Sequence, residues 1–206
     1  MPRHAASAAK RFRSRGFAWL LSICLLAVQP WAQATQGPGL LPQTYQRLTT
    51  IHELIDAGKT EPALIKLVEL LKSVGQRGYE RAVVLQNLGH VQASLEQYPA
   101  AIKSLVESLS LKALPGTTEQ QMRYNLAQLY LASDEPARAI TVLETWFEQA
   151  DTPPASAWLL LGHTHAELGN YRKAIPAMKR AIELSDSPSA DWYENLLAMH
   201  HELREY

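Results

Sequence analysis

Histidine is the residue type in this 206-residue chain that most invites a chemical interpretation. Two pairs are close in sequence, His163 with His165 and His200 with His201. Two imidazoles on one helix hold a metal ion when they stand three or four positions apart, because that spacing puts them on the same face. Offsets of two and one place these pairs on different faces. The sequence therefore predicts solvated or partly packed imidazoles and no metal site.

No other group of residues indicates catalysis. The acidic residues are scattered without a pair spaced for general acid-base work, and no nucleophile elbow or glycine-rich phosphate loop occurs. We therefore expect a protein that is not an enzyme, with no catalytic residues and no cofactor. The alternative is a metal-binding or small-ligand-binding enzyme built on helical repeats. Several imidazoles with a pKa near ~6.5 would also make a groove that contains them sensitive to mild acid.

The elements that would position these side chains are clearest between Trp158 and Ile182. Trp158, Leu161 and Gly162, followed by Ala174 and Met178, match the 34-residue tetratricopeptide pattern W-x2-L-G then A-x3-F, with His165 in place of the usual Tyr. This pattern predicts two helices joined by a tight turn at Gly169-Asn170. The small residues Gly162 and Ala174 mark the closest approach of the two helices. One such hairpin buries a single face, so it needs neighbours.

The same pattern recurs along the chain. It predicts units over 44–81, 82–119, 120–154 and 155–189, and a half unit over 190–206. The second helix of each full unit carries an alanine followed four positions later by a large apolar residue: Ala63 and Leu67, Ala101 and Leu105, Ala139 and Leu143, Ala174 and Met178. The predicted fold class is therefore all-α, a tetratricopeptide-type α-α superhelix, meaning a right-handed solenoid of helical hairpins. We expect the half unit to be the end of a shortened copy of a longer repeat protein; the alternative is that its helix is the cap.

The predicted starts of the second helices, and one proline inside a predicted helix, add detail to this repeat pattern. Thr60, Asp134 and Asn170 are predicted to cap the second helices of their units, because their side-chain oxygens suit an N-cap. Pro176 falls inside the predicted last second helix, where it removes one backbone hydrogen bond. The apolar stripe continues past it, so we expect a kink and not a helix end.

The first 34 residues have the pattern of a secretory signal peptide. A basic stretch precedes an apolar run over 17–28, and Ala32-Gln33-Ala34 has the form of a cleavage site. We therefore expect cleavage after Ala34, a flexible lead-in over 35–43, and a periplasmic protein without stable membrane insertion after cleavage. The alternatives are a retained anchor, for which the run is shorter than the roughly 20 residues needed, and a lipoprotein attached at Cys24. Cys24 is the only cysteine, so the exported chain forms no intramolecular disulfide.

The charge balance of the exported part argues against nucleic acid as a partner. The leader holds five basic residues and no acidic one, so the remainder has 15 basic and 20 acidic residues. It has no basic stripe that would displace counterions from phosphates.

A peptide or protein is the partner that the repeat pattern favours. In such hairpins the first helix of each unit lines the concave groove, and its second, fifth, ninth, twelfth and thirteenth positions face a ligand. Hydrogen-bonding groups alternating with apolar ones suit an extended or helical peptide. The predicted protein-binding groove is formed by Leu48, His52, Gln86, His90, Tyr124, Gln128, Leu159, His163 and Glu194.

Three segments carry a narrower likeness: YERAVVLQNLGHVQASLEQYPAAI (79–102), ALPGTTEQQMRYNLAQLYLA (113–132) and GNYRKAIPAMKRAIEL (169–184). In these, residues 41–206 resemble the exported tetratricopeptide proteins associated with TonB energy-transduction systems of Gram-negative bacteria. The resemblance implies a periplasmic adaptor that contacts TonB-complex components and supports uptake of iron carriers. It brings no catalytic residues. Family members continue with further repeats that are absent here. The alternative within the binding class is an adaptor in cell-envelope or outer-membrane assembly.

Overall fold

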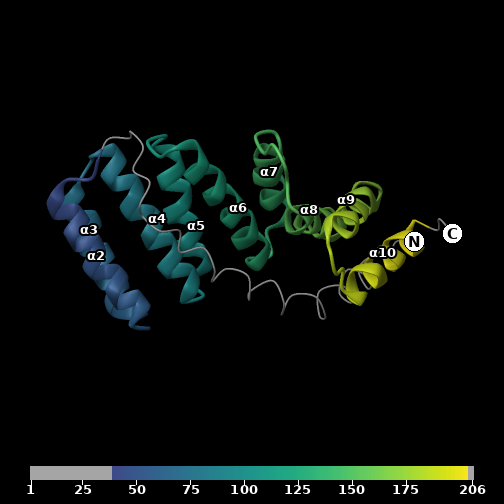
Figure 1. The fold of residues 1–206 in the computed structure, drawn as a ribbon, viewed down its shortest axis with the longest axis horizontal. Coiled ribbons are helices and arrows are strands. Elements are labelled where there is room, and N and C mark those ends of the chain that lie inside the picture. Colours follow the sequence, from purple (N-terminus) through teal and green to yellow (C-terminus); the bar gives the residue numbers. More distant parts are fainter. Residues whose placement is uncertain (1–38, 204–206) are drawn as a thin grey trace, which may run out of the picture. The chain divides into compact units, whose positions relative to one another are not determined.

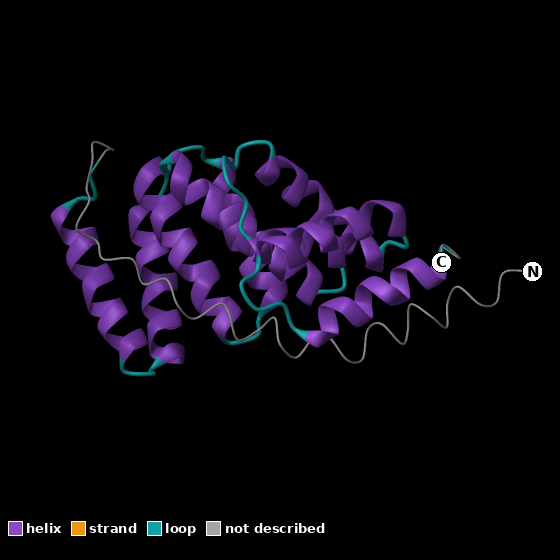
Figure 2. Ribbon diagram, turned by 45° about the vertical axis from the view of Figure 1, so that its right-hand side comes forward, coloured by secondary structure: helices purple, strands orange, loops and turns teal. Residues whose placement is uncertain are grey.

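The computed structural model describes residues 39–203, and within them every regular element is a helix (Figures 1 and 2). The predicted signal peptide, its cleavage site and residues 35–38 of the lead-in lie outside the described residues. No helix in the described range is long and apolar enough to cross a membrane. The helices are α2 (Pro42–Asp56), α3 (Thr60–Val74), α4 (Gly78–Ser94), α5 (Tyr98–Ser110), α6 (Gly116–Ala132), α7 (Pro136–Phe147), α8 (Ala155–Glu167), α9 (Tyr171–Leu184) and α10 (Ala190–Glu202).

The helices belong to two compact units. One contains α2 to α7, within residues 34–150, and the other contains α8 to α10, within residues 151–206. In both units, consecutive helices pair as hairpins: α2 with α3, α4 with α5, α6 with α7, and α8 with α9. Each pair corresponds to one predicted repeat, and α10 corresponds to the predicted half unit. The first helices begin at residues 42, 78, 116, 155 and 190.

All four hairpins turn in the same way. The fifteenth residue of each predicted unit has a positive φ, between 58° and 71°, and these residues are Gly58, Glu96, Asp134 and Gly169. The N–H of this residue bonds the carbonyl three residues earlier, and the next N–H bonds the carbonyl five residues before itself, as in Lys59 to Leu54 at 2.8 Å. This pair of bonds is the Schellman arrangement, which satisfies the last carbonyls of a helix. The identical turn fixes how the second helix returns along the first.

The paired helices approach most closely at the small residues that the sequence pattern singles out. The four repeating alanines, Ala63, Ala101, Ala139 and Ala174, are fully buried. A methyl group added at Gly89 would lie 2.5 Å from Leu105 Cδ2 and 3.3 Å from the Ala101 carbonyl oxygen. At Gly162 it would lie 3.2 Å from Met178 N and 3.4 Å from the Ala174 carbonyl oxygen. The same contact therefore holds α4 to α5 and α8 to α9.

A buried carboxylate ties the first repeat to the second. Glu80, in the first turn of α4, is buried and accepts a hydrogen bond from the backbone N–H of Leu41 at 3.2 Å, which is at the start of α2. It also accepts hydrogen bonds from the side chains of Thr44 and Arg77. Burial alone would raise the pKa of Glu80, but these hydrogen bonds together with the Arg77 charge outweigh burial and lower it. Glu80 therefore stays ionised. Its carboxylate accepts the hydrogen bond of the N-cap residue of α2, where no side chain of α2 itself makes a capping hydrogen bond.

The second helices begin close to the predicted positions, but the predicted capping hydrogen bonds from side chains are not formed. The N-caps of α3, α7 and α9 are Lys59, Glu135 and Asn170, and no side chain makes a capping hydrogen bond at any of them. Thr60 and Asp134 are therefore not the N-caps. Asn170 does occupy the N-cap position of α9, but its side chain makes no capping hydrogen bond. The prediction of capping side chains was wrong because the Schellman turn sets where the second helix begins. Helix α9 continues through Pro176 to Leu184, so this proline does not end the helix.

Two glycines of one helix test the importance of the close approach. Gly89→Ala should lower the free energy of unfolding, since crowding a buried site costs about 1–3 kcal/mol and the gain in helix propensity returns at most about 1 kcal/mol. The control is Gly78→Ala in the first turn of the same helix, where an added methyl meets nothing within 4 Å. It should be neutral or slightly stabilising. Urea denaturation of both variants measures the difference, and equal stabilities would contradict the packing argument.

The tie at Glu80 predicts a dependence on acid. A carboxyl group whose folded pKa lies below its unfolded value stabilises the fold above that unfolded value, and the contribution disappears as the pH falls through the folded pKa. Glu80→Gln should therefore lower the unfolding free energy at pH 7 by about 1–3 kcal/mol and flatten its fall below pH 4.5, the ordinary value for this group. Glu69→Gln, at an exposed position of α3, should stay within about 0.5 kcal/mol of the parent protein. Thermal unfolding between pH 3 and 7 would show both.

Candidate functional site

Six of the nine predicted groove residues lie on neighbouring first helices of one compact unit, and five of these six keep access to solvent. We call these five residues the first-helix row: His52 on α2, Gln86 and His90 on α4, and Tyr124 and Gln128 on α6. His90 is exposed, and the other four are half-buried. Their amide, imidazole and phenol groups all keep some access to a partner.

Two other predicted groove residues lie in the interior. Leu48 is 2% exposed and Leu159 is 9% exposed. Leu159 packs with Ala174, Ile175 and Met178 in the core of the α8–α10 unit. Both leucines occupy the fifth position of their repeats, where an aliphatic side chain gains more from burial than from facing water. They support the helices and present little surface to a ligand.

The row is bridged between repeats by histidine-asparagine pairs. His52 Nε2 lies 2.8 Å from Asn87 Oδ1, which joins α2 to α4. The Asn87 amide nitrogen donates to the Val83 carbonyl at 2.8 Å. Because the amide nitrogen is engaged there, the oxygen faces the imidazole and His52 Nε2 is the donor.

The next pair has the opposite polarity. His90 Nε2 lies 3.5 Å from Asn125 Nδ2, which joins α4 to α6. Asn125 Oδ1 accepts a bond from Gln121 Nε2 at 3.0 Å, so the amide nitrogen faces His90 and the ring nitrogen accepts. His90 keeps an accessible edge, but the atoms crowded around it lower its pKa by desolvation. Its neutral form is the one that this pair requires.

Asn87 and Asn125 are the site residues that the sequence reasoning missed. Each is 35 residues after its histidine, and the two asparagines stand at the sixth position of their repeats. The signal was present in the sequence as two His-Asn pairs of equal separation. The predicted groove took in only the fifth and ninth positions of each unit, so it left them out.

Aromatic rings close the α6 end of the row. The Tyr124 ring lies 5.4 Å from that of Trp146 on α7, at an interplanar angle of 46°, and Trp146 meets Phe147 edge to face at 5.2 Å. Tilted and edge-to-face rings at these separations attract each other beyond simple burial. Tyr124 is thereby held in place by the Trp146 ring.

His163 and Glu194, the remaining predicted residues, belong to the α8–α10 unit. Glu194 is exposed on α10, whereas His163 is half-buried on α8. Burial lowers the pKa of His163 to about 4, so its imidazole is neutral near pH 7. Between residues 39 and 203, no three His, Cys, Asp or Glu side chains gather as a metal site would need.

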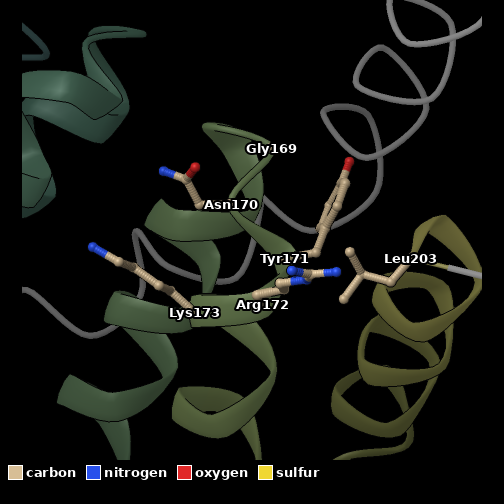
Figure 3. Close-up of a pocket in the computed structure, with 6 residues that line it drawn as sticks. All are labelled: Gly169, Asn170, Tyr171, Arg172, Lys173 and Leu203. Atoms are coloured by element: carbon tan, nitrogen blue, oxygen red, sulfur yellow. The ribbon is translucent and has the colours of Figure 1, made fainter. Parts of the chain in front are cut away.

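A pocket of about 340 Å³ lies where the first turn of α9 meets the end of α10 (Figure 3). Arg172 extends toward Leu203 and the Tyr171 ring rises beside it, whereas Asn170 and Lys173 point away from Leu203. Burial, and then the nearby Glu202 charge, raise the pKa of Tyr171. The pocket holds two cationic side chains at its surface and no arrangement of groups for catalysis.

Comparison with known proteins identifies the kind of repeat in the C-terminal part of the chain. The tetratricopeptide repeat family model matches residues 124–191 and 159–206. The matched part of the chain, residues 124–206, therefore carries tetratricopeptide repeats. No curated protein matches its sequence.

Solved structures agree with this fold over most of the chain. MamA 41-end from Desulfovibrio magneticus RS-1 has a TM-score of 0.68 and 21% identity, with 81% of this chain and 89% of that chain covered. A tetratricopeptide repeat protein from Parabacteroides merdae has a TM-score of 0.65 and 20% identity over 80% of this chain and 62% of that chain. YrrB has a TM-score of 0.65 and 18% identity over 77% of each chain. The fold is the all-α tetratricopeptide solenoid.

The lowered pKa of His163 predicts a loss of stability in mild acid. Between its ordinary value of 6.5 and its folded value of about 4, the unfolded state binds more protons than the folded state. The free energy of unfolding should therefore fall as the pH drops through this window and level off below it. His163→Gln should remove this part of the pH dependence, and His163→Asn should behave alike. Urea titrations at pH 7, 6, 5 and 4 test it; an unchanged slope in both variants would contradict the assignment.

Proposed function

We propose that this tetratricopeptide protein is a periplasmic scaffold that binds an extended peptide segment of another protein along the first-helix row, beside a TonB-type energy-transduction complex. The observation that carries the binding part is the row itself, where neighbouring first helices of one compact unit carry hydrogen-bonding side chains with access to solvent.

The bridging asparagines suit a peptide backbone. The Asn87 amide group uses one N–H on Val83 and accepts one bond from His52. An amide has two N–H groups and an oxygen with two lone pairs, so one donor and one acceptor remain at Asn87, and by the same count at Asn125. A peptide backbone offers the complementary carbonyl and N–H at every residue. Recognition through the backbone would leave sequence preference to the neighbouring side chains of the row.

The composition of the row indicates which kind of peptide would fit it. Its members are two histidines, two glutamines and a tyrosine, with no lysine, arginine or carboxylate among them. A ligand therefore gains hydrogen bonds and aromatic contact from this row and no ion pair. Mixed polar and apolar peptides fit better than strongly charged ones.

Similar proteins and the sequence support the rest of the proposal. YrrB is described as a tetratricopeptide protein with an unusual peptide-binding site, which makes peptide binding on this fold concrete. The leader sequence supports export to the periplasm. The resemblance of residues 41–206 to the exported proteins of TonB systems supports the cellular setting.

Cross-linking in living cells under iron limitation tests both the row and the partner. The triple variant Gln86→Ala, His90→Ala and Gln128→Ala should lose at least about tenfold of the cross-linked partner, because it removes the hydrogen-bonding groups that face it. The control triple, Lys66→Ala, Glu69→Ala and Lys103→Ala, changes exposed residues of second helices and should retain it.

The identity of the captured proteins separates the possible settings. TonB-complex components should be recovered. In the same cross-linked complexes, the scaffold protein itself should begin at Thr35, as expected after removal of the signal peptide. Recovery of outer-membrane assembly factors alone would point to an adaptor in envelope assembly. Equal capture by both triple variants would rule out the row as the binding surface.

A further inference from the structure

Helix α10 has two apolar stripes, and only one of them is covered. Trp192, Leu196 and Leu203 pack against the core of the α8–α10 unit, and Met199 is fully buried in it. Tyr193 and Leu197, each one residue further along, form a second stripe that is 52% and 71% exposed. Residues four apart share a helix face, so these two side chains make a continuous exposed surface. We call it the α10 face.

The internal repeat shows what normally covers this face. Leu197 is the eighth residue of its predicted unit, and the eighth residues of the four hairpins are Ile51, Gly89, Ala127 and Gly162, all of which are buried. Each lies on a first helix that is paired with a second helix. Among residues 39–203, the only helix that makes more than minor contact with α10 is α9, the second helix of the preceding hairpin.

The covering helix has a constant pattern in all four hairpins. It runs antiparallel to the first helix after a tight turn, and it presents a buried alanine followed four residues later by a buried Leu or Met. An interface that continues this internal packing would take the same kind of helix. The first repeat is the nearest precedent, because its eighth residue is the large Ile51, and α3 packs on that helix.

The acidic residues at the start of α10 indicate which charge a partner helix would carry at one end. Asp191 lies in the first turn of α10 and Glu194 is exposed in the next turn. A helix that runs antiparallel brings its last turn to this acidic end. Basic residues are favoured in the last turn of a helix by its dipole and would here also face two carboxylates. The structure thus specifies the apolar pattern of the partner and the sign of charge at one end.

We propose that the α10 face docks an amphipathic α-helix of a partner protein, antiparallel to α10, which presents a small residue, a large apolar residue four positions later, and basic residues in its last turn. This contact is separate from the first-helix row and does not depend on the proposed peptide binding there. It would give the scaffold a second attachment point.

The occupant is a single helix because of the size of the face. A helix of 13 residues is about 20 Å long, and one face of it offers well below the roughly 800 Å² per partner of a standard stable interface. Two copies meeting only through α10 would have little to hold them together. A helix that belongs to an already attached partner gains from the raised effective concentration.

A peptide taken from the protein itself serves as the probe. Residues 59–76 contain α3, with Ala63, Leu67 and a lysine, Lys72, in the last turn. This peptide carries the required pattern and already packs on a large eighth residue. With a fluorescent label, it should bind the full chain saturably in anisotropy titrations up to about 1 mM peptide. Binding should weaken at least about tenfold in the protein variant Leu197→Glu, since a carboxylate would be buried in the contact.

Matched controls separate this site from others. Val106→Glu replaces another exposed apolar residue, on α5, and should leave peptide binding unchanged. A peptide with Leu67→Glu should fail to bind, and the triple variant of the first-helix row should bind the parent peptide normally. Circular dichroism checks that Leu197→Glu remains folded, as expected for a side chain so exposed.

Four results would overturn the proposal. One is the absence of saturable binding, and another is equal binding by Leu197→Glu. The third is a concentration-dependent dimer in light scattering that Leu197→Glu abolishes, because it would show that a second copy covers the face. Loss of binding in the row variant, with Leu197→Glu unaffected, would place the peptide in the row and count equally against the α10 face.

Discussion

The close approach of two antiparallel helices is the contact on which the rest of this structure depends. A methyl group at Gly89 would force the Leu105 side chain to shift, and one at Gly162 would push back the backbone at Ala174 and Met178 by a few tenths of an ångström. Short separation lets large apolar side chains fill the seam at interior density. Because each hairpin buries only this seam, the outer sides of its helices remain for the next repeat and for a partner.

The turn and the seam together determine which side chains are accessible. A left-handed residue at the fifteenth position reverses the chain in a fixed way, whether that residue is Gly58 or Glu96. Once the second helix is placed, the eighth position of the first helix must face it. The ninth position then points to the adjacent side, where His52 and His90 meet the asparagines of the following repeat. The row is therefore a consequence of packing on the other side of the same helices.

The sequence was sufficient to predict the packing features that recur in every repeat. The four alanines, the large residue four places after each, and the number of hairpins all follow from one helical period and one repeat length. Features that depend on pairs of residues from different repeats were harder. Burial of Leu48 could not be read from its position, because the equivalent Gln86 remains partly accessible. Glu80 gave no signal at all, since its role is to cap a helix that lies 39 residues away in the chain.

Position within the repeat also explains why one helix type offers two kinds of surface. On α4, the eighth residue, Gly89, packs against α5. Only the positions beside it on the helix are therefore accessible to a ligand. On α10, the eighth residue is Leu197, and nothing between residues 39 and 203 covers it. A glycine there would suit a tightly packed helix and expose little, whereas leucine exposes a large apolar side chain to water at a cost of about 1.5–3 kcal/mol relative to burial. A partner helix at this place would recover that free energy. The packing rule that leaves the row open on the paired first helices therefore also leaves an apolar face on α10, where Leu197 is the most exposed large apolar side chain among residues 39–203.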